Sequence, residues 1–470
     1  MPDEFTIYTH QFKQVLQLAC HDNKALTCQH AGGSRPGLTT MRRIAVIGSG
    51  ISGLSVAHAL APRTQVTLFE ADARFGGHSH TVDVRLHGVR HGVDTGFLVF
   101  NHRTYPRLVE LFRQLEVPTA PSEMSFSVQV PQQGIEWSGC DLNTVFAQRS
   151  NLLRPRFLGM LAQIVRFNRL ATHLAEAGDE AAMAEPISGF LSRHGFGEAF
   201  RDWYLLPMLG CIWSCPTDQM LRFPVATMIR FCHNHGLIQV SNRPQWHTVV
   251  GGSRVYVRKM LASIADARLR TPVRSVRRIG GGVMVATDAG SEHFDEVVLA
   301  CHSDQALSLL ADARDDERRV LGAIRYQPNH AVLHTDASVL PRRKLAWAAW
   351  NYERAADTAR EQSAVCLHYL INRLQPLPWR TPVLVSLNPG RAIAQDKIIG
   401  AYEYSHPVFD TAAINAQQRL PTIQGHSNTW YCGAWTRYGF HEDGLMSGLA
   451  VAAALRERWQ AEQAETREAA

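Results

Sequence analysis

The stretch RRIAVIGSGISGLSVAHAL, which begins at Arg42, constrains the fold of this chain more than any other feature of its sequence. Residues 44–47 form a short apolar run of the kind that becomes a buried parallel strand, and the run leads directly into Gly48-Ser49-Gly50-Ile51-Ser52-Gly53. Apolar residues then recur at helical spacing from Leu54 to Leu60. A strand, a G-x-G-x-x-G loop and a helix in this order predict a Rossmann-type unit that binds a dinucleotide.

The three glycines of this loop have different physical tasks. Gly48 permits the tight turn out of the strand, Gly50 lets the backbone approach a pyrophosphate, and Gly53 lets the helix pack closely against the strand. Backbone amides at the N-terminus of the helix then face the phosphate charge. An ordinary glycine-rich turn in another α/β protein is the simpler alternative, but the strand and the helix that flank the loop disfavour it.

The segment after the helix narrows the choice of nucleotide. The apolar run Gln65–Phe69 ends on Glu70, about twenty residues past the loop, where an acid binds ribose hydroxyls and disfavours the 2′-phosphate of NADP. This acid leaves NAD and FAD open. Gly76-Gly77 and a polar run follow in EADARFGGHSHT, and only a cofactor with a ribityl chain and a ring beyond its diphosphate needs this second glycine pair. The sequence therefore favours FAD.

Length and composition indicate a globular enzyme of two domains. The chain has 470 residues, more than one ordinary core holds, with 45% hydrophobic and 19% charged residues. No apolar run approaches the roughly 18 residues of a membrane span, so we expect no transmembrane helix. The net charge of +6 is carried mostly by arginine, without a zinc finger, a helix-turn-helix signal or a lysine-rich tail. We therefore expect no nucleic-acid partner.

The cysteine pattern indicates reduced thiols in a cytoplasmic protein, because the nine cysteines are odd in number and scattered through a long chain. Cys211 and Cys215 are four residues apart, but no second pair lies near them, so buried free thiols are the simpler interpretation. The polar segments that contain His78 and His91 lack the carboxylate–histidine spacing of a metal site. We predict no metal site.

The distribution of strand-like and helical segments predicts discontinuous domains. Residues 1–40 show no usable periodicity and no secretory signal, and Met41 stands directly before the first strand, so we interpret them as a disordered leader or a misassigned start. Residues 150–236 are largely helical, and strand-like segments return on both sides. The pattern predicts an α/β fold with a discontinuous Rossmann-type FAD-binding domain, an inserted mixed α+β substrate domain and a short tail. The predicted FAD-binding domain comprises residues 41–105, 240–310 and 425–460. The predicted substrate domain comprises residues 106–239 and 311–424, and the tail comprises residues 461–470.

This arrangement resembles the flavin amine oxidase superfamily, which includes protoporphyrinogen oxidases and phytoene desaturases, from residue 42 to about residue 460. Within the superfamily it is most similar to bacterial oxidoreductases whose genes often accompany cyclopropane fatty-acid synthase-like methyltransferases. The resemblance implies an oxidoreductase with non-covalently bound FAD. It also suggests a lipid methyltransferase as a partner.

The resemblance assigns further positions to the FAD site. Asp94-Thr95-Gly96-Phe97 matches the segment beneath the flavin, and Val273 matches the residue whose backbone meets adenine. The helix that begins after Gly439 is expected to aim its positive N-terminus at the flavin and to stabilise negative charge on the reduced ring. His78 stands where the family usually has an arginine on the diphosphate. The predicted FAD contacts are Gly48, Ser49, Gly50, Ile51, Ser52, Gly53, Glu70, Ala71, Gly77, His78, Gly96, Phe97, Val273, Ala300, Gly433, Glu442, Gly444 and Leu445.

The inserted domain points to a hydrophobic substrate. Its apolar and aromatic composition suits an acyl chain, a polyene or a tetrapyrrole better than a polar amine. Amine-oxidising relatives place a lysine near the flavin in a strand that here reads YQPNHAVLH, residues 326–334, without a lysine. We therefore predict hydride transfer to or from a fatty-acyl or other lipid-like substrate, in a desaturation, a saturation or a double-bond rearrangement. An amine oxidase-type flavoenzyme and a flavoprotein whose structural FAD supports a lipid-modifying partner are the alternatives.

Three residues are candidates for proton transfer near the flavin. His330 is the predicted relay, with Asn329 beside it, and His441 is second because it adjoins the predicted flavin-binding turn. A histidine that is satisfied in the core or at the surface is the simpler alternative.

One helical segment raises the question of membrane contact. Residues 151–174 interleave apolar side chains with four arginines, and a basic amphipathic helix can lie on an anionic membrane. A helix of the substrate domain with solvated arginines is the simpler interpretation. We expect a cytoplasmic protein, with peripheral contact at the inner face of the membrane as the second possibility.

Overall fold

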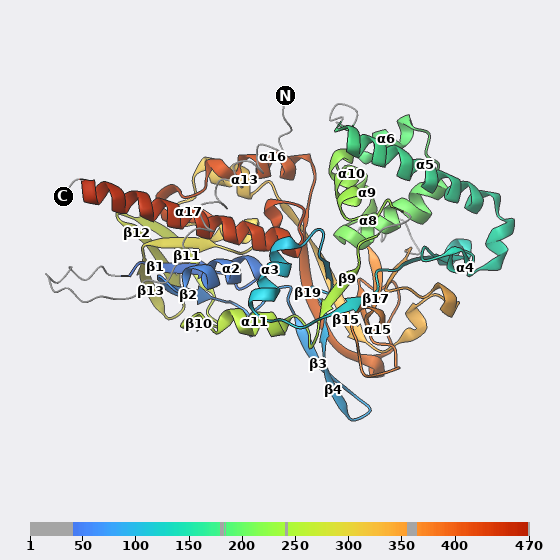
Figure 1. Cartoon of the computed structure of the whole chain (residues 1–470), viewed down its shortest axis with the longest axis horizontal. Helices are drawn as coiled ribbons and strands as arrows, with labels where there is room; N and C mark the ends of the chain where they lie inside the picture. Colours follow the sequence, from blue (N-terminus) through green and yellow to red (C-terminus); the bar gives the residue numbers. More distant parts are fainter. Residues whose placement is uncertain (1–40, 179–182, 184, 240–242, 355–363, 469–470) are drawn as a thin grey trace. The chain divides into compact units, whose positions relative to one another are not determined.

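The computed structural model describes residues 41–178, 183, 185–239, 243–354 and 364–468 (Figure 1). The predicted leader, residues 1–40, lies outside the described residues. Residues 42–470 form one compact unit, so the boundaries between the two predicted domains stay a prediction.

A five-stranded parallel sheet carries the predicted dinucleotide motif. Its strands lie in the order β10 (Asp266–Arg268), β2 (Gln65–Phe69), β1 (Arg43–Ile47), β14 (Glu296–Leu299) and β20 (Thr429–Tyr431). α2 (Ile51–Leu60) follows β1 and packs against the last helix, α17 (His441–Glu468). Because both faces of a parallel sheet are covered, the strands are almost continuously apolar. Segments from three distant parts of the sequence therefore form one sheet, as predicted.

Smaller elements surround this sheet. The glycines at 280–282 form the first turn of an antiparallel ribbon. The ribbon consists of β11 (Val273–Ile279), β12 (Gly282–Thr287) and β13 (Gly290–Phe294). A hairpin joins β3 (Thr81–Leu86) to β4 (Val89–Asp94), and a third small sheet has the order β5 (Phe100–Asn101), β9 (Trp246–Val249), β6 (Thr119–Ser122). The helices of this part are α3 (Pro106–Gln114), α11 (Arg254–Leu261), α12 (Ser303–Leu309), α13 (Asp315–Leu321) and α16 (Thr411–Arg419).

A second, seven-stranded sheet has mixed strand directions. Its order is β19 (Ile398–Val408), β15 (Arg325–His334), β18 (Leu384–Leu387), β17 (Cys366–Leu370), β16 (Trp350–Glu353), β7 (Phe126–Val130) and β8 (Ile135–Ser138). All neighbours are antiparallel except β16 and β7. α15 (Ile371–Leu374) follows β17. All seven strands come from residues that the sequence assigned to the inserted domain.

The helical stretch expected at 150–236 is present. It contains η2 (Arg149–Leu153), α5 (Pro155–Ala177), α6 (Ile187–Arg193), α7 (Glu198–Phe200), the π-helical η4 (Arg201–Leu205), α8 (Leu206–Trp213), α9 (Thr217–Met220) and α10 (Val225–Asn234), after the short α4 (Leu142–Val145). α5 packs against α10, and Figure 1 shows α6 beside them. Among the described residues, no helix is long and apolar enough to cross a membrane.

Candidate cofactor and substrate site

One cavity of about 1450 Å³ joins the parallel sheet to the helical stretch. It begins at the glycine loop after β1 and at Glu70 after β2, and it extends to side chains of α5, α8 and α10. The cavity has three parts: a nucleotide end at the glycine loop, a central segment, and an apolar arm among the helices. Ligands of parallel α/β sheets bind at this edge, beyond the carboxyl ends of the strands.

The glycine loop has the geometry that the motif predicts. A Cβ on Gly48, whose φ is +103°, would lie 2.8 Å from the carbonyl oxygen of Ala300, and one on Gly53 would lie 1.9 Å from the carbonyl oxygen of Gly48. A Cβ on Gly50 would meet no atom within 4 Å, because this residue faces the cavity. Gly48 and Gly53 are therefore required by protein packing, whereas Gly50 leaves space for a ligand.

A second loop completes the nucleotide end. The amide of Gly76 donates to the carbonyl oxygen of Ser49 at 3.1 Å, and a Cβ on Gly77 would lie 3.0 Å from the Cα of Gly50. The Glu70 carboxylate accepts hydrogen bonds from the amides of Ser49 at 3.0 Å and Asp72 at 2.9 Å, which fixes it at the edge of the cavity. These residues fit the diphosphate and ribose of FAD. The predicted contacts Ile51, Ser52, Ala71, His78, Gly96, Phe97, Val273, Ala300 and Gly433 also line the cavity.

The start of α17 differs from the expectation. The Glu442 carboxylate accepts hydrogen bonds from the amides of Arg107 at 2.8 Å and Leu108 at 2.9 Å, at the N-terminus of α3. Gly444 packs on α2, since a Cβ there would lie 2.8 Å from Ile51, and Leu445 is a core residue. Four predicted FAD contacts do not line the cavity: Glu442, Gly444, Leu445 and Gly53. The first turn of α17 docks on two helices, and only its first residue, His441, reaches the cavity.

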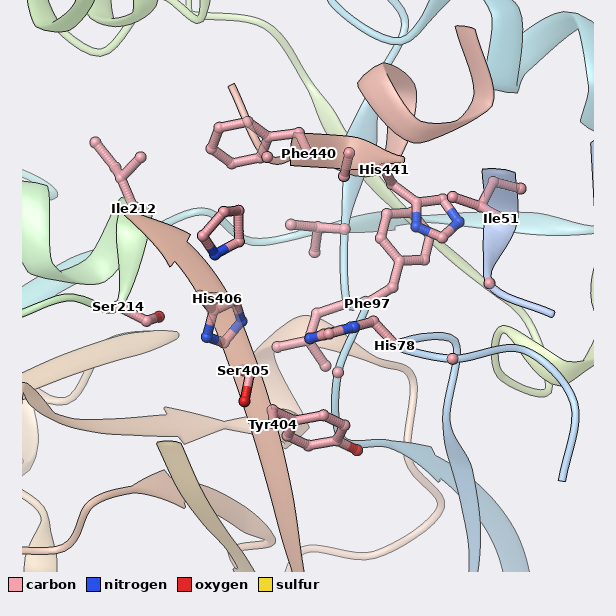
Figure 2. A pocket seen from close by; sticks show the side chains of 18 of the residues that line it. Ile51, His78, Phe97, Ile212, Ser214, Tyr404, Ser405, His406, Phe440 and His441 are labelled. Carbon is pink, nitrogen blue, oxygen red and sulfur yellow. The ribbon is translucent and has the colours of Figure 1, made fainter. Parts of the chain in front are cut away.

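Aromatic and histidine side chains form the central segment of the cavity (Figure 2). The rings of Phe97 and His441 stack with centroids 3.9 Å apart, and the centroids of His78 and His406 are 5.3 Å apart. Burial lowers the pKa of His406 to about 4 and that of His441 to about 3, and burial with the neighbouring His406 lowers the pKa of His78. These imidazoles are therefore neutral near pH 7. The buried Nε2 of His78 has no hydrogen-bond partner among the described residues, as expected of an atom that awaits a ligand.

A chain of amides determines the tautomer of His406. The backbone N–H of His330 donates to Asn388 Oδ1 at 2.9 Å, and Asn388 Nδ2 donates to Asn329 Oδ1 at 2.8 Å. Asn329 Nδ2 then faces both the carbonyl oxygen of Gln327 at 3.1 Å and His406 Nδ1 at 3.0 Å. A backbone N–H only donates and a carbonyl only accepts, so both amide orientations are fixed. His406 Nδ1 must accept, and the neutral ring carries its proton on Nε2.

The predicted proton relay, His330, lies outside the cavity. Successive residues of a strand point to opposite faces, so Asn329 is buried beneath His406 while the His330 side chain is 48% exposed. His330 Nδ1 is 2.5 Å from Glu403 Oε1 on the neighbouring strand β19. The structure thus replaces His330 with His406 at the centre of the cavity. Sequence reasoning missed His406, and the one available signal was a polar Ser-His pair at the end of the aromatic run that forms β19.

The third candidate, His441, lies in the central segment. Its Nε2 is 2.6 Å from the hydroxyl of Tyr256, which also contacts Ser79 Oγ.

The apolar arm extends from the central segment into the helices. Phe440 of the central segment stacks on Phe231 of α10 with centroids 4.7 Å apart. The arm is lined by Val145, Leu161, Ile164, Tyr204, Met208, Cys211, Ile212, Leu237, Trp246, Trp350 and Tyr369. Glu123, a carboxylate of the lining, is paired with Arg373 at 2.6 Å. Arg243 adds a cation to the lining.

A separate buried cluster lies between β16 and β17. Glu353, Cys366 and His368 have potential metal-ligand atoms within 4.8 Å of one another. The Glu353 carboxylate already accepts hydrogen bonds from Gln129 at 3.1 Å and Arg391 at 3.2 Å. The absence of a metal site stays a prediction.

Three solved structures illustrate what this fold is similar to. The CLA-producing fatty acid isomerase from P. acnes is 16% identical, with a TM-score of 0.61 over 89% of this chain and 98% of that chain. Cyclohexylamine oxidase from Brevibacterium oxydans is 14% identical, with a TM-score of 0.65 over 89% of this chain and 100% of that chain. Putrescine oxidase bound to putrescine is 14% identical, with a TM-score of 0.61 over 88% and 99%.

The sequence itself matches one family. No curated protein has a significantly similar sequence. The family described as flavin containing amine oxidoreductase matches residues 51–353, more than half of the chain. This match begins at Ile51, inside the glycine loop, and includes Glu70 and the second glycine pair. It agrees with a cavity whose nucleotide end fits FAD. The chain therefore belongs to the flavin-containing amine oxidoreductase family and is an FAD-dependent oxidoreductase.

Proposed function

We propose that this enzyme transfers a hydride to or from a hydrophobic substrate with a long alkyl or alkenyl chain, of the fatty-acyl lipid class. The observation that carries the proposal is the apolar arm, which is continuous with the nucleotide end and the central segment. Bound FAD supplies the hydride acceptor or donor. The fold alone does not choose the substrate, because similar folds include both a fatty acid isomerase and amine oxidases.

The charges of the arm argue against a cationic amine. An ammonium group that enters a low-dielectric cavity needs an anionic partner. Glu123 is paired with Arg373, and the Glu403 side chain is 71% exposed to solvent and not held inside the arm. An alkyl chain needs no such partner, and burial of each CH₂ group contributes about 0.8 kcal/mol.

The residues of the central segment supply hydrogen bonds and not strong acid. His406 presents a fixed neutral N–H, and the low pKa values of His406 and His441 keep both rings neutral near pH 7. Phe97 and Phe440 add apolar surface to the lining beside them. Desaturation, saturation or a shift of a double bond moves a proton as well as a hydride; bound FAD would exchange the hydride, and the neutral rings of His78 and His441 are the groups of the central segment that can exchange the proton.

Anaerobic titration of the FAD-loaded enzyme tests this proposal. We expect long-chain unsaturated fatty acids to change the FAD absorbance or to be recovered with altered double bonds, and we expect benzylamine and putrescine to do neither. Ile212 lines the arm, so the larger indole of Ile212→Trp should occupy space that the substrate chain needs. We expect this variant to weaken the lipid response about tenfold or more while FAD stays bound. Leu345→Trp, at an exposed position, is the matched control.

Rapid bleaching by an amine, with no response to any lipid, would overturn the substrate class. A flavoprotein whose FAD is only structural, such as a partner of a lipid methyltransferase, would respond to neither class and would still retain FAD. The titration therefore distinguishes an amine-oxidising enzyme from a flavoprotein whose FAD is only structural.

A further inference from the structure

Exposed apolar side chains gather where α4, η2 and α5 follow one another. They are Leu142, Leu152, Leu153, Leu158 and Val165, and we call them the α4–α5 patch. Leu142 is 78% exposed and Leu153 is 87% exposed. Single exposed leucines are ordinary, but five within one short segment indicate a surface that contacts something apolar. α5 packs against α7, α10 and η2, and Figure 1 shows α4 near the end of α5 that η2 joins to it.

The patch adjoins the apolar arm of the cavity. On a helix, residues three and four apart are neighbours on the surface. Leu161 lines the arm, and it lies three residues after the exposed Leu158 and four before the exposed Val165. Val145 of α4 also lines the arm, three residues after Leu142. The exposed apolar surface is therefore continuous with the cavity wall on both elements.

The charge of the same segment is strongly positive. Residues 141–170 contain five arginines and one acid, Asp141. Arg156 is paired with Glu198 at 3.6 Å and Arg166 donates to the carbonyl of His194 at 2.7 Å, so the charge of the patch comes from Arg149, Arg154 and Arg169. Arg149 donates to backbone carbonyls of α4 and its flank, and Arg154 donates to the carbonyl of Gly134, so both are held near the patch. Arg169 is exposed, four residues beyond Val165. Arginine beside exposed leucine complements an anionic lipid surface.

We propose that the α4–α5 patch docks on the surface of an anionic lipid bilayer and that acyl chains pass from the bilayer into the apolar arm. The second half of this statement rests on the proposed function, whereas the docking itself does not. The helices carry their apolar side chains into the headgroup region, and Arg149, Arg154 and Arg169 bind lipid phosphates. The cavity then receives a substrate that never crosses water.

Vesicle flotation of the full-length FAD-loaded protein tests the docking. We expect binding to vesicles that contain phosphatidylglycerol, binding at least about tenfold weaker to pure phosphatidylcholine, and loss of binding in high salt. Leu153→Asp with Leu158→Asp should reduce binding about tenfold or more, because both side chains leave the headgroup region. Leu269→Asp with Ile279→Asp, at exposed positions away from α4, η2 and α5, is the matched control and should bind as the natural chain does.

The patch variants must keep the FAD absorbance and the melting temperature of the natural chain. If the aspartate variant does not, Leu153→Ser with Leu158→Ser is used in its place. Unchanged flotation of the patch variants, or no binding of the natural chain to anionic vesicles, would overturn the proposal. A shift from dimer to monomer in the patch variants, without vesicle binding of the natural chain, would assign the patch to a second copy. Vesicle binding without any lipid response of FAD would leave the docking and reject only the substrate class.

Discussion

At the scale of single residues, the alternation of a strand decides which side chains reach the cavity. Asn329 and His330 are adjacent in β15, yet Asn329 is fully buried and orients His406, while His330 lies outside the cavity and contacts Glu403 of its lining. The amide chain that ends at Asn329 holds His406 as a neutral ring with its proton on Nε2. A neutral imidazole in a fixed orientation is a hydrogen-bond donor and not a proton shuttle.

His406→Phe tests this role through the bound FAD. Loss of a hydrogen-bond donor from the cavity should destabilise the reduced form of bound FAD, which carries more negative charge. We expect a fall of roughly 30 mV in the two-electron reduction potential, the equivalent of one hydrogen bond of about 1.4 kcal/mol. His406→Gln retains an N–H and should shift the potential less. An unchanged potential and absorbance spectrum in His406→Phe would reject the assignment.

Asn329→Asp provides a second measurement of the same arrangement. A carboxylate at residue 329 accepts a hydrogen bond from Nδ1–H of the protonated His406 ring, so it should raise the pKa of His406 from about 4 towards neutrality. The FAD spectrum of the variant should then change between pH 5 and pH 8, whereas His406 causes no such change in the natural chain. Asn372→Asp, at an amide that bonds backbone groups elsewhere, is the control.

At the scale of elements, β16 and β17 of the mixed sheet are joined by a buried ion pair. His368 Nε2 lies 3.2 Å from Glu353 Oε2. Burial alone lowers the pKa of His368, but the neighbouring Cys366 and Glu353 outweigh it and raise this pKa to about 9. The strand pairing therefore depends on a charge that the unfolded chain, with a histidine pKa near 6.5, holds only in acid.

The pH dependence of stability follows from this pKa. The folded value exceeds the unfolded one, so the stabilisation is fully present below pH 6.5 and is lost as the pH rises through about 9. We expect the free energy of unfolding to fall over this window, by an amount on the order of 3 kcal/mol from the charge on His368. Urea denaturation of the natural chain and of His368→Gln at pH 6, 8 and 9.5 measures it. Equal slopes with pH in both proteins would contradict the prediction.

At the scale of the whole molecule, one cavity connects parts that are distant in the sequence. All of its lining residues lie between Ile47 and His441, and the parallel sheet draws its strands from both ends of that range. FAD binding and the core of residues 42–470 are therefore coupled, because the glycine loop, the second loop and the start of α17 meet only in the folded unit.

A chain that begins at Met41 tests the extent of this unit. We expect it to fold, to bind FAD and to unfold at the same temperature as the full-length chain, because the cavity lining starts after residue 41. Absorbance of the purified proteins and thermal denaturation provide the comparison. Loss of flavin from the shorter chain would show that residues 1–40 contribute to the site.

The sequence by itself determined the nucleotide-binding unit and its cofactor. The residues of a Rossmann loop are contiguous, and each glycine answers a local steric demand, so Gly48, Gly50, Gly53 and Glu70 could be assigned from their spacing. The discontinuous fold followed from the recurrence of strand and helix patterns. The apolar composition of the inserted segments likewise indicated an apolar cavity.

Only the tertiary structure decided what surrounds the reacting centre. The pairing of β15 with β19 places His406 beside Asn329, and no local pattern encodes that register. The docking of α17 on α2 and α3 turns Glu442 and Leu445 away from the cavity, although their motif suggested contact with the flavin. These positions depend on how distant segments pack, and packing is a property of the assembled core and not of any short stretch of residues.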